Sequence, residues 1–152
     1  MGRGAMTPAR RRWVCLVAAL LWASGAGWLV AHHWLVRPGD YGPVPSPVEP
    51  WALRLHGGCG YAAVALLGLL WGVHIGPRWR MRRARLSGAL LVSVTLVLTG
   101  SGWLLYYVAD DDWRAGIAQL HWLLGLAGLP VFLAHRLTAR GRARRGRAAP
   151  DL

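Results

Sequence analysis

Four histidines lie within apolar stretches of the chain that are about as long as a membrane is thick. One pair, His121 and His135, lies near the two ends of one stretch, and the other pair, His56 and His74, lies near the two ends of another. An ionisable side chain inside a helix of membrane length is costly and by default indicates function. Two helices that each carry a histidine near either end predict two stacked sites, with one imidazole from each helix in each site.

The spacing of each pair predicts that its two imidazoles share one face of a helix. His121 and His135 are 14 residues apart, which places the second ring within about 40° of the first and about 21 Å along the axis. His56 and His74 are 18 residues apart, or about five full turns and 27 Å in a regular α-helix. The second pair is therefore expected to be eclipsed.

The apolar residues that surround these histidines form four blocks. Hydrophobic residues make up 55% of the 152-residue chain, and each block holds 22 or 23 residues, enough to cross a hydrocarbon layer of about 30 Å. We predict an all-α fold, an up-down bundle of four transmembrane helices. The predicted membrane domain is residues 13–138, between a basic N-terminus at 1–12 and a basic tail at 139–152, with spans at 13–34, 53–75, 86–108 and 117–138.

The net charge of +12 follows the positive-inside pattern of membrane proteins. All 18 basic residues are arginine, and 15 of them fall in three clusters that lie outside the apolar blocks or, for Arg136, at the end of one. With four spans, these clusters lie on one side of the membrane, which predicts that both termini are cytoplasmic. Because this pattern already explains the basic charge, we do not expect the protein to bind nucleic acid. We expect it to contact membrane lipid. The clusters are Arg3, Arg10, Arg11 and Arg12; Arg78, Arg80, Arg82, Arg83 and Arg85; and Arg136, Arg140, Arg142, Arg144, Arg145 and Arg147.

The first span leaves one question of processing open. It follows three arginines and contains small residues at 23–26, so it could be a cleaved signal peptide. We favour an uncleaved helix, because apolar residues resume at Gly27 and extend the segment to membrane length. The segment after it, 36–50, contains five prolines and predicts an extended exterior loop.

The two cysteines are not expected to form a disulfide. Cys15 lies at the inner start of the first predicted span and Cys59 at the outer start of the second. A disulfide needs Cα atoms within about 7 Å, much less than the thickness of a membrane. The sequence also has no CxxCH motif, so covalent attachment of a c-type haem is not indicated.

The histidine pattern suits haem b. The second and fourth spans run in the same direction, which puts His56 with His121 near the outer face and His74 with His135 near the inner face. Diagonal helices of a four-helix bundle leave room for a flat macrocycle with one axial imidazole from each side. Two imidazoles leave no open iron position, so such a site favours electron transfer. Four arginines near the histidines could neutralise haem propionates: Arg54, Arg78, Arg114 and Arg136.

The chain resembles small four-helix bacterial membrane proteins of the dihaem cytochrome b group. The resemblance covers about residues 53–140 and rests on LHGGCGY, GVHIG, TGSGWLLYYVADDDWR and LHWLLGLAGLPVFLAHR. That group includes the membrane subunits of formate dehydrogenases and nickel-iron hydrogenases, and its smaller members are associated with exported FMN-binding proteins. The resemblance implies two haems b, axial ligation by the same four histidines, exchange of electrons with quinone, and an exterior redox partner that could carry flavin.

The chain departs from this group in the spacing of one histidine pair. Cytochromes b of the bc type have spacings close to 14 on both helices, whereas here one spacing is 18. The extra turn, about 5.4 Å, must be absorbed by tilt or by a different outer ligand. His33, at the outer end of the first span, is the candidate substitute for His56.

We therefore expect an electron-transfer subunit of an oxidoreductase in the bacterial cytoplasmic membrane, part of a respiratory chain rather than a complete enzyme. Two other readings remain open. The histidines could hydrogen-bond between helices of a cofactor-free membrane anchor, or the outer histidines could capture copper or zinc for binding or transport. The second reading lacks thioether pairs and carboxylates inside the spans.

Overall fold

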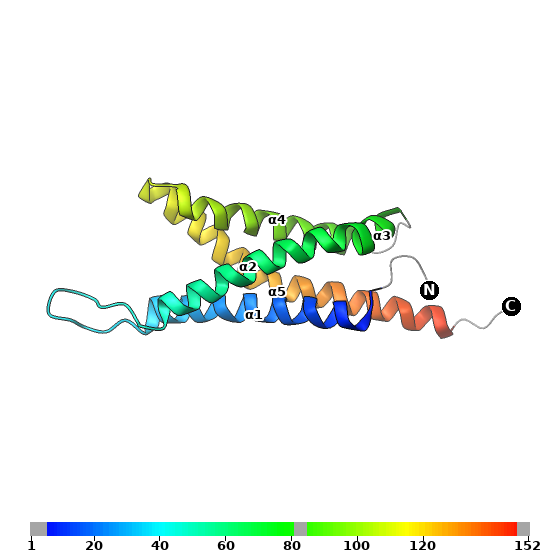
Figure 1. Ribbon diagram of the computed structural model, residues 1–152, viewed down its shortest axis with the longest axis horizontal. Helices are drawn as coiled ribbons and strands as arrows, with labels where there is room; N and C mark the ends of the chain where they lie inside the picture. The colour runs from blue at the N-terminus through cyan, green and yellow to red at the C-terminus, as the bar shows by residue number, and fades with distance from the viewer. Residues whose placement is uncertain (1–5, 81–84, 149–152) are drawn as a thin grey trace. The chain divides into compact units, whose positions relative to one another are not determined.

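The computed structural model describes residues 6–80 and 85–148, with side chains described up to Ala139. Arg3, Arg82, Arg83 and the side chains of the arginines from 140 onward lie outside the described residues. Within the described part the fold is all-α, as predicted, with one isolated β-bridge and no strand. The elements are α1 (Pro8–Trp34), α2 (Glu49–Leu70), the π-helical turn η1 (Trp71–Ile75), α3 (Gly76–Arg80), α4 (Arg85–Tyr107) and α5 (Asp111–Ala148) (Figure 1).

Four helical stretches have the length and apolar composition needed to cross a membrane, as predicted. They are Pro8–Trp34, Glu49–Arg80, Arg85–Tyr107 and Asp111–Ala139. The apolar side chains of these helices mostly face outward: among the described hydrophobic residues, only Ala31 and Cys59 are buried. A soluble protein could not leave so much apolar surface in water, whereas lipid tails solvate it at no cost. The chain thus has the architecture of a membrane protein.

The helices form two antiparallel pairs, each in its own compact unit. The N-terminal unit, Met6–Leu70, contains α1 packed along α2. The C-terminal unit begins at Trp71 and contains η1, α3 and the packed pair α4 and α5. The two helices of each pair run antiparallel (Figure 1), joined by the proline-rich loop between α1 and α2 and by a short turn between α4 and α5. His121 and His135 both lie on α5, so they belong to the same helix pair.

Polar residues define where two of the helices begin. Thr7 caps α1 by accepting a hydrogen bond from the Arg10 backbone N–H at 3.3 Å, and Pro8 follows where a missing N–H costs nothing. The helix therefore starts before the predicted apolar boundary at Trp13. Asp110 caps α5 in the same way, because its carboxylate accepts from the Trp113 N–H at 2.9 Å.

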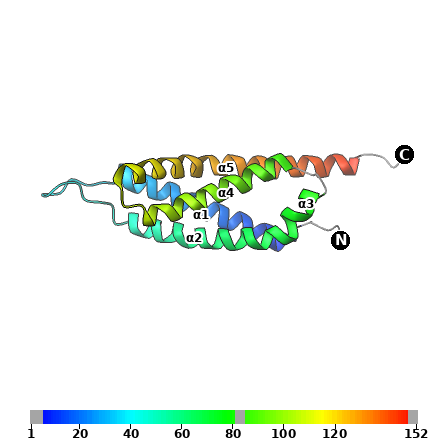
Figure 2. The same cartoon turned by 90° about the horizontal axis from the view of Figure 1, so that it is seen from above.

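The proline-rich connection between α1 and α2 is an extended loop, as predicted, but it contains a small hairpin. Arg37 and Val44 exchange backbone hydrogen bonds of 3.0 and 2.9 Å. Gly42 closes the turn with a φ of 119°, a conformation that only glycine adopts without strain. The loop projects from the ends of the two helices (Figure 2). The helix after it starts at Glu49, so Pro50 lies in the first turn, where proline is tolerated.

The second membrane helix does not stop at residue 75, where the predicted span ends, but continues past Pro77. The chain passes from α2 through η1, which contains His74, and continues as α3 to Arg80. Proline lacks an N–H and its ring clashes with the carbonyl four residues earlier, and a local π-turn accommodates both. The prediction that His56 and His74 are eclipsed assumed a regular α-helix, and the π-turn breaks that regularity.

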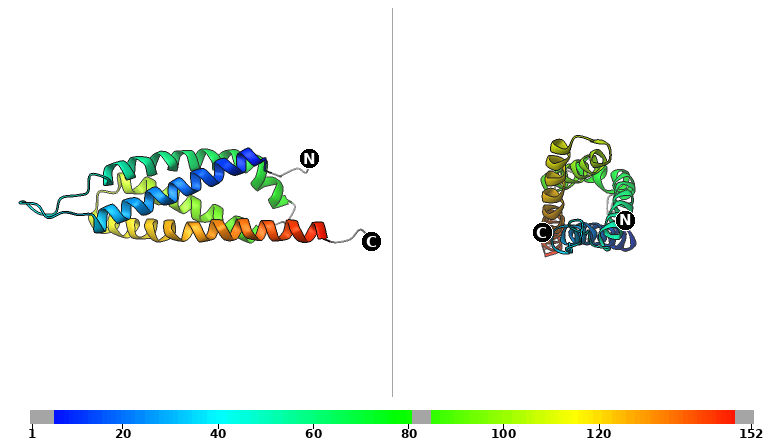
Figure 3. Two further views of the ribbon diagram at one scale, coloured as in Figure 1. Left: turned by 90° about the horizontal axis from the view of Figure 1, so that it is seen from below. Right: turned by 90° about the vertical axis from the view of Figure 1, so that its left-hand side faces the viewer.

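Pro130, by contrast, lies inside α5 without interrupting it. This helix runs from Asp111 to Ala148 (Figure 3) and so extends past the predicted end of the fourth span at Thr138. The 14 residues between His121 and His135 are therefore helical throughout. The prediction that the two rings lie within about 40° of each other assumed a continuous helix, and α5 is continuous between them.

We expect the Asp110 cap to contribute measurably to stability. Replacing Asp110 with alanine removes the acceptor for the Trp113 N–H and should lower the free energy of unfolding by about 1 kcal/mol. Asp110→Asn keeps a side-chain oxygen and should lose much less. Thermal unfolding followed by far-ultraviolet circular dichroism in detergent measures both variants, and equal midpoints for the two would contradict this role.

Candidate functional site

The four predicted site histidines are half-buried, whereas the two at the C-terminal end of α1 are exposed. His56 lies on α2, His74 in η1, and both His121 and His135 on α5. Because a half-buried imidazole within an apolar helix loses most of its water, it needs hydrogen-bond partners from the protein. The partners of three of these rings follow one pattern.

His56 is held by the neighbouring helix α1. Its Nδ1 lies 3.0 Å from the Leu21 carbonyl oxygen and 3.2 Å from the Ser24 hydroxyl. The next residue, Gly25, lies directly beneath the ring: a Cβ atom built there would be 2.9 Å from the imidazole Cε1. Such a distance is a steric clash, so the ring occupies space that only glycine leaves open.

His121 is held in the same way by α4. Its Nδ1 lies 2.9 Å from the hydroxyl of Ser101, which is one of the few buried polar residues described. Gly102 follows, and a Cβ there would lie 3.2 Å from the imidazole Cε1. Ser101 thus hydrogen-bonds to the His121 ring, and Gly102 leaves the space that the ring occupies.

His135 completes the pattern at the other end of the same helix pair. Its Nδ1 lies 3.1 Å from the Ser87 hydroxyl of α4. Here the glycine is looser, because a Cβ at Gly88 would lie at an ordinary van der Waals distance of 3.8 Å from Cε1. Arg78 of α3 also lies close enough to His135 to act on it electrostatically.

We call each of these serine-glycine pairs a saddle. Ser87 and Ser101 are 14 residues apart on α4, which equals the separation of His135 and His121 on α5. Because the two helices are antiparallel, this equal spacing places one saddle opposite each histidine. The sequence analysis missed this relation. Its signal was the dipeptide Ser-Gly at three places in the apolar blocks, of which 24–25 was considered as part of a cleavage region.

His74 differs from the other three in its surroundings. It lies within the π-turn η1 and belongs to the same unit as His135. Arg78 is four residues further along the chain, and it is this residue that approaches His135. Isolated π-turns occur frequently at functional sites because they redirect a side chain. The predicted inner pair of His74 and His135 thus lies in one unit, whereas the predicted outer pair is divided between two and stays a prediction.

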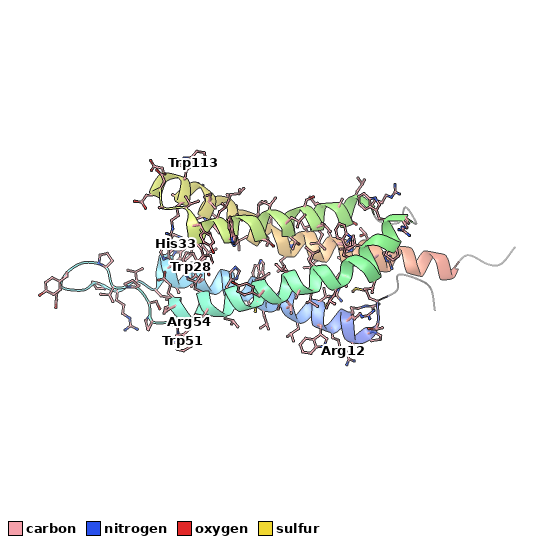
Figure 4. The ribbon with its side chains drawn as sticks, turned by 45° about the horizontal axis from the view of Figure 1, so that its top comes forward. Arg12, Trp28, His33, Trp51, Arg54 and Trp113 are labelled. Atoms are coloured by element: carbon pink, nitrogen blue, oxygen red, sulfur yellow. The ribbon has the colours of Figure 1, made fainter. Side chains whose placement is uncertain are left out.

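Two of the four arginines predicted to hold propionates stack on aromatic rings. The Arg54 guanidinium lies 4.9 Å from the centroid of the Trp51 ring at the start of α2, and Arg136 lies 5.7 Å from that of Phe132 (Figure 4). Arg78 differs, because its Nε is buried without a hydrogen-bond partner among the described residues. Because a buried charged group without a hydrogen bond is costly, Arg78 would gain the most of these four arginines from an anionic partner.

The C-terminal end of α1 holds a second polar group, within the N-terminal unit. His32 Nδ1 lies 2.7 Å from a carboxylate oxygen of Glu49, and its ring stacks on Trp28 at 4.7 Å. His33, the candidate substitute ligand, packs edge-on against His32 and is exposed at the end of α1 opposite Arg12 (Figure 4). An exposed ring at a helix end is less constrained than the saddle-held rings.

The chemistry available to this set is coordination through imidazole nitrogen. A histidine that bonds through Nδ1 to the protein typically coordinates a metal through Nε2. Among the described residues, no three histidine, cysteine or acidic side chains group to hold a metal ion. Axial ligation of a haem does not need such a group, since one or two imidazoles suffice.

Comparisons with protein-family profiles, with curated proteins and with solved structures find no match to this chain. The functional argument therefore rests on the residues and their geometry. The resemblance to the dihaem cytochrome b group stays a prediction.

Alanine substitutions at the saddle glycines can be compared with the same substitution at nearby glycines on the same helix. Gly25→Ala should destabilise the protein by about 1–3 kcal/mol, as overpacking does, because its Cβ would meet His56. Gly27→Ala on the same helix should be tolerated, since nothing lies within 4 Å of the added Cβ. Gly102→Ala and Gly100→Ala form the matching pair on α4. Thermal stability in detergent distinguishes them, and the prediction fails if both members of a pair behave alike.

Proposed function

We propose that this protein is a membrane cytochrome b that carries electrons across the bilayer through two haems b, each held by two histidines. The observation that carries the proposal is the set of half-buried imidazoles on α2 and α5, three of which engage the neighbouring helix through Nδ1. This arrangement directs coordination to Nε2, the nitrogen that an axial haem ligand uses in such sites. His74 would complete the set of four.

The donor set fits haem better than a metal ion bound by the protein alone. Imidazole is a good axial ligand of haem iron, and the porphyrin supplies the other ligands. Copper or zinc would need more protein ligands, and within the described residues no group of three exists. The buried Arg78 Nε offers a hydrogen-bond donor for a propionate next to His135.

In this proposal the bound haem supplies one-electron chemistry, and the chain supplies everything else. The imidazoles would hold the iron, and the serine-glycine saddles would orient the imidazoles. His121 and His135 are 14 residues apart, about 21 Å along α5, so the two ligands would lie toward opposite faces of the membrane. The apolar helices exclude water, which makes the potential of each haem sensitive to the nearby charges.

The proposed orientation puts both termini in the cytoplasm of a bacterium, following the positive-inside pattern. The loop with the hairpin and the acidic turn before α5 then face the exterior, where a redox partner would dock. The partner could be flavin-bearing, and quinone is the proposed membrane-soluble partner. We propose that it serves as an electron-transfer subunit of an oxidoreductase.

A cofactor-free membrane anchor is the second candidate, and one observation favours it. The contacts between Nδ1 and the serine hydroxyls would also satisfy an imidazole that binds no cofactor. The two candidates differ in what the second ring nitrogen does, so the haem content of the protein separates them.

We expect two haems b per chain. The full-length protein, expressed with ample haem and purified in detergent, should show a reduced-minus-oxidised difference spectrum typical of haem b and a haem-to-protein ratio of two. A ratio of one would remove one of the two proposed sites. No bound haem would exclude the cytochrome and leave the anchor.

Substitution of single histidines tests the ligand assignment. His135→Ala should abolish one of the two haem signals, because that imidazole is one of two axial ligands. His33→Ala is the matched control and should keep both signals, since His33 is exposed at the end of α1. Retention of both haems in His135→Ala would overturn the assignment, and loss of the outer haem in His33→Ala would make His33 its ligand.

A further inference from the structure

We infer that Ser24, Ser87 and Ser101 are positioning residues that hold the hydrogen of the facing imidazole on Nδ1 and so keep the lone pair on Nε2. This inference deepens the proposed function and rests on it, because the proposed function identifies haem iron as the metal that Nε2 would bind. The hydrogen-bond geometry carries it, because His56 faces a carbonyl that can only accept, and the shortest contact of Ser101 is to a carbonyl of its own helix.

For His121, the direction follows from what Ser101 does with its only hydrogen. The Ser101 hydroxyl donates to the Val97 carbonyl at 2.7 Å, with Leu98 as a second acceptor at 3.2 Å. A serine hydroxyl has one hydrogen to give. With that hydrogen committed to its own helix, the hydroxyl oxygen can only accept from His121 Nδ1. Because the contact to Val97 is the shorter of the two, donation to that carbonyl leaves the 2.9 Å contact to His121 with the hydrogen on Nδ1.

For His56, the direction follows from a carbonyl. The Leu21 carbonyl oxygen lies 3.0 Å from His56 Nδ1 and can only accept. It also accepts from the Ser24 hydroxyl at 3.1 Å, which leaves the Ser24 oxygen as a second acceptor for the same Nδ1 hydrogen. Both contacts require the same tautomer that Ser101 requires of His121.

Gly25 fixes the orientation of the His56 ring. A Cβ at Gly25 would lie 2.9 Å from Cε1, 3.1 Å from Nδ1 and 3.7 Å from Nε2 of His56. The Nδ1–Cε1 edge of the imidazole therefore rests on α1, and Nε2 is the more distant nitrogen. The serine selects the tautomer and the glycine selects the edge, so together they determine where the lone pair points.

The same device at both ends of one helix pair argues that it serves the histidines. The two saddles of α4 repeat at the same 14-residue spacing as the two histidines of α5. Partners in the second coordination shell that orient a ligating histidine typically affect metal affinity by about 10- to 100-fold. A tautomer set in advance also lowers the cost of binding, because the ring need not reorganise.

The test measures the tautomer in haem-free, full-length protein. With histidine labelled in ¹⁵N, the imidazole resonances of His121 should show the hydrogen on Nδ1 in the wild type. Ser101→Ala should give a mixture of tautomers, and Ser101→Thr should restore the wild-type form. Thr99→Ala is the matched control, since the Thr99 hydroxyl donates to the Thr95 carbonyl of its own helix at 2.8 Å and is exposed.

An unchanged tautomer in Ser101→Ala would overturn the inference. Where that variant does not fold, Ser87→Ala reads the same effect on His135. In protein loaded with haem, Ser101→Ala should raise the haem dissociation constant about 10- to 100-fold, and Thr99→Ala should leave it unchanged. Equal affinity in the two variants would overturn the positioning role. A wild type that binds no haem would refute the proposed function, while the haem-free measurement still decides the tautomer.

Discussion

An imidazole inside an apolar helix must hydrogen-bond to whatever helix lies beside it, and this constraint shapes both helix pairs. His56, His121 and His135 each reach a serine hydroxyl on the adjacent helix. Such a contact requires close approach of the two backbones, and the glycine that follows each serine makes room for the ring. At each site, the serine thus provides the hydrogen bond that the imidazole needs, and the glycine next to it allows the helices to pack closely.

The register of the helix pairs follows from these contacts. Helix association in lipid has no hydrophobic driving force, so packing and interhelical hydrogen bonds decide which residues face each other. On α4 and α5 the hydrogen bonds occur at two levels 14 residues apart. A shift of one residue would break both contacts and place each ring against a side chain larger than glycine. The two contacts therefore hold the pair in one alignment.

The π-turn at Trp71–Ile75 is the clearest departure from regular geometry. It contains the candidate ligand His74 and directly precedes the helix with Pro77. Arg78 follows on α3 and approaches His135. The predicted inner histidines and a buried guanidinium nitrogen thus occur together in the C-terminal unit.

The sequence by itself determined the all-α class, the four apolar segments and the identity of the histidines, because these depend on local composition and helical period. It also contained the equal spacing of the α4 saddles and the α5 histidines, but that relation has meaning only once the register between helices is known. Only the tertiary structure decided that Ser24, Ser87 and Ser101 face imidazoles and that Pro77 continues the helix through a π-turn. Contacts between helices depend on their alignment in space, which no local pattern encodes.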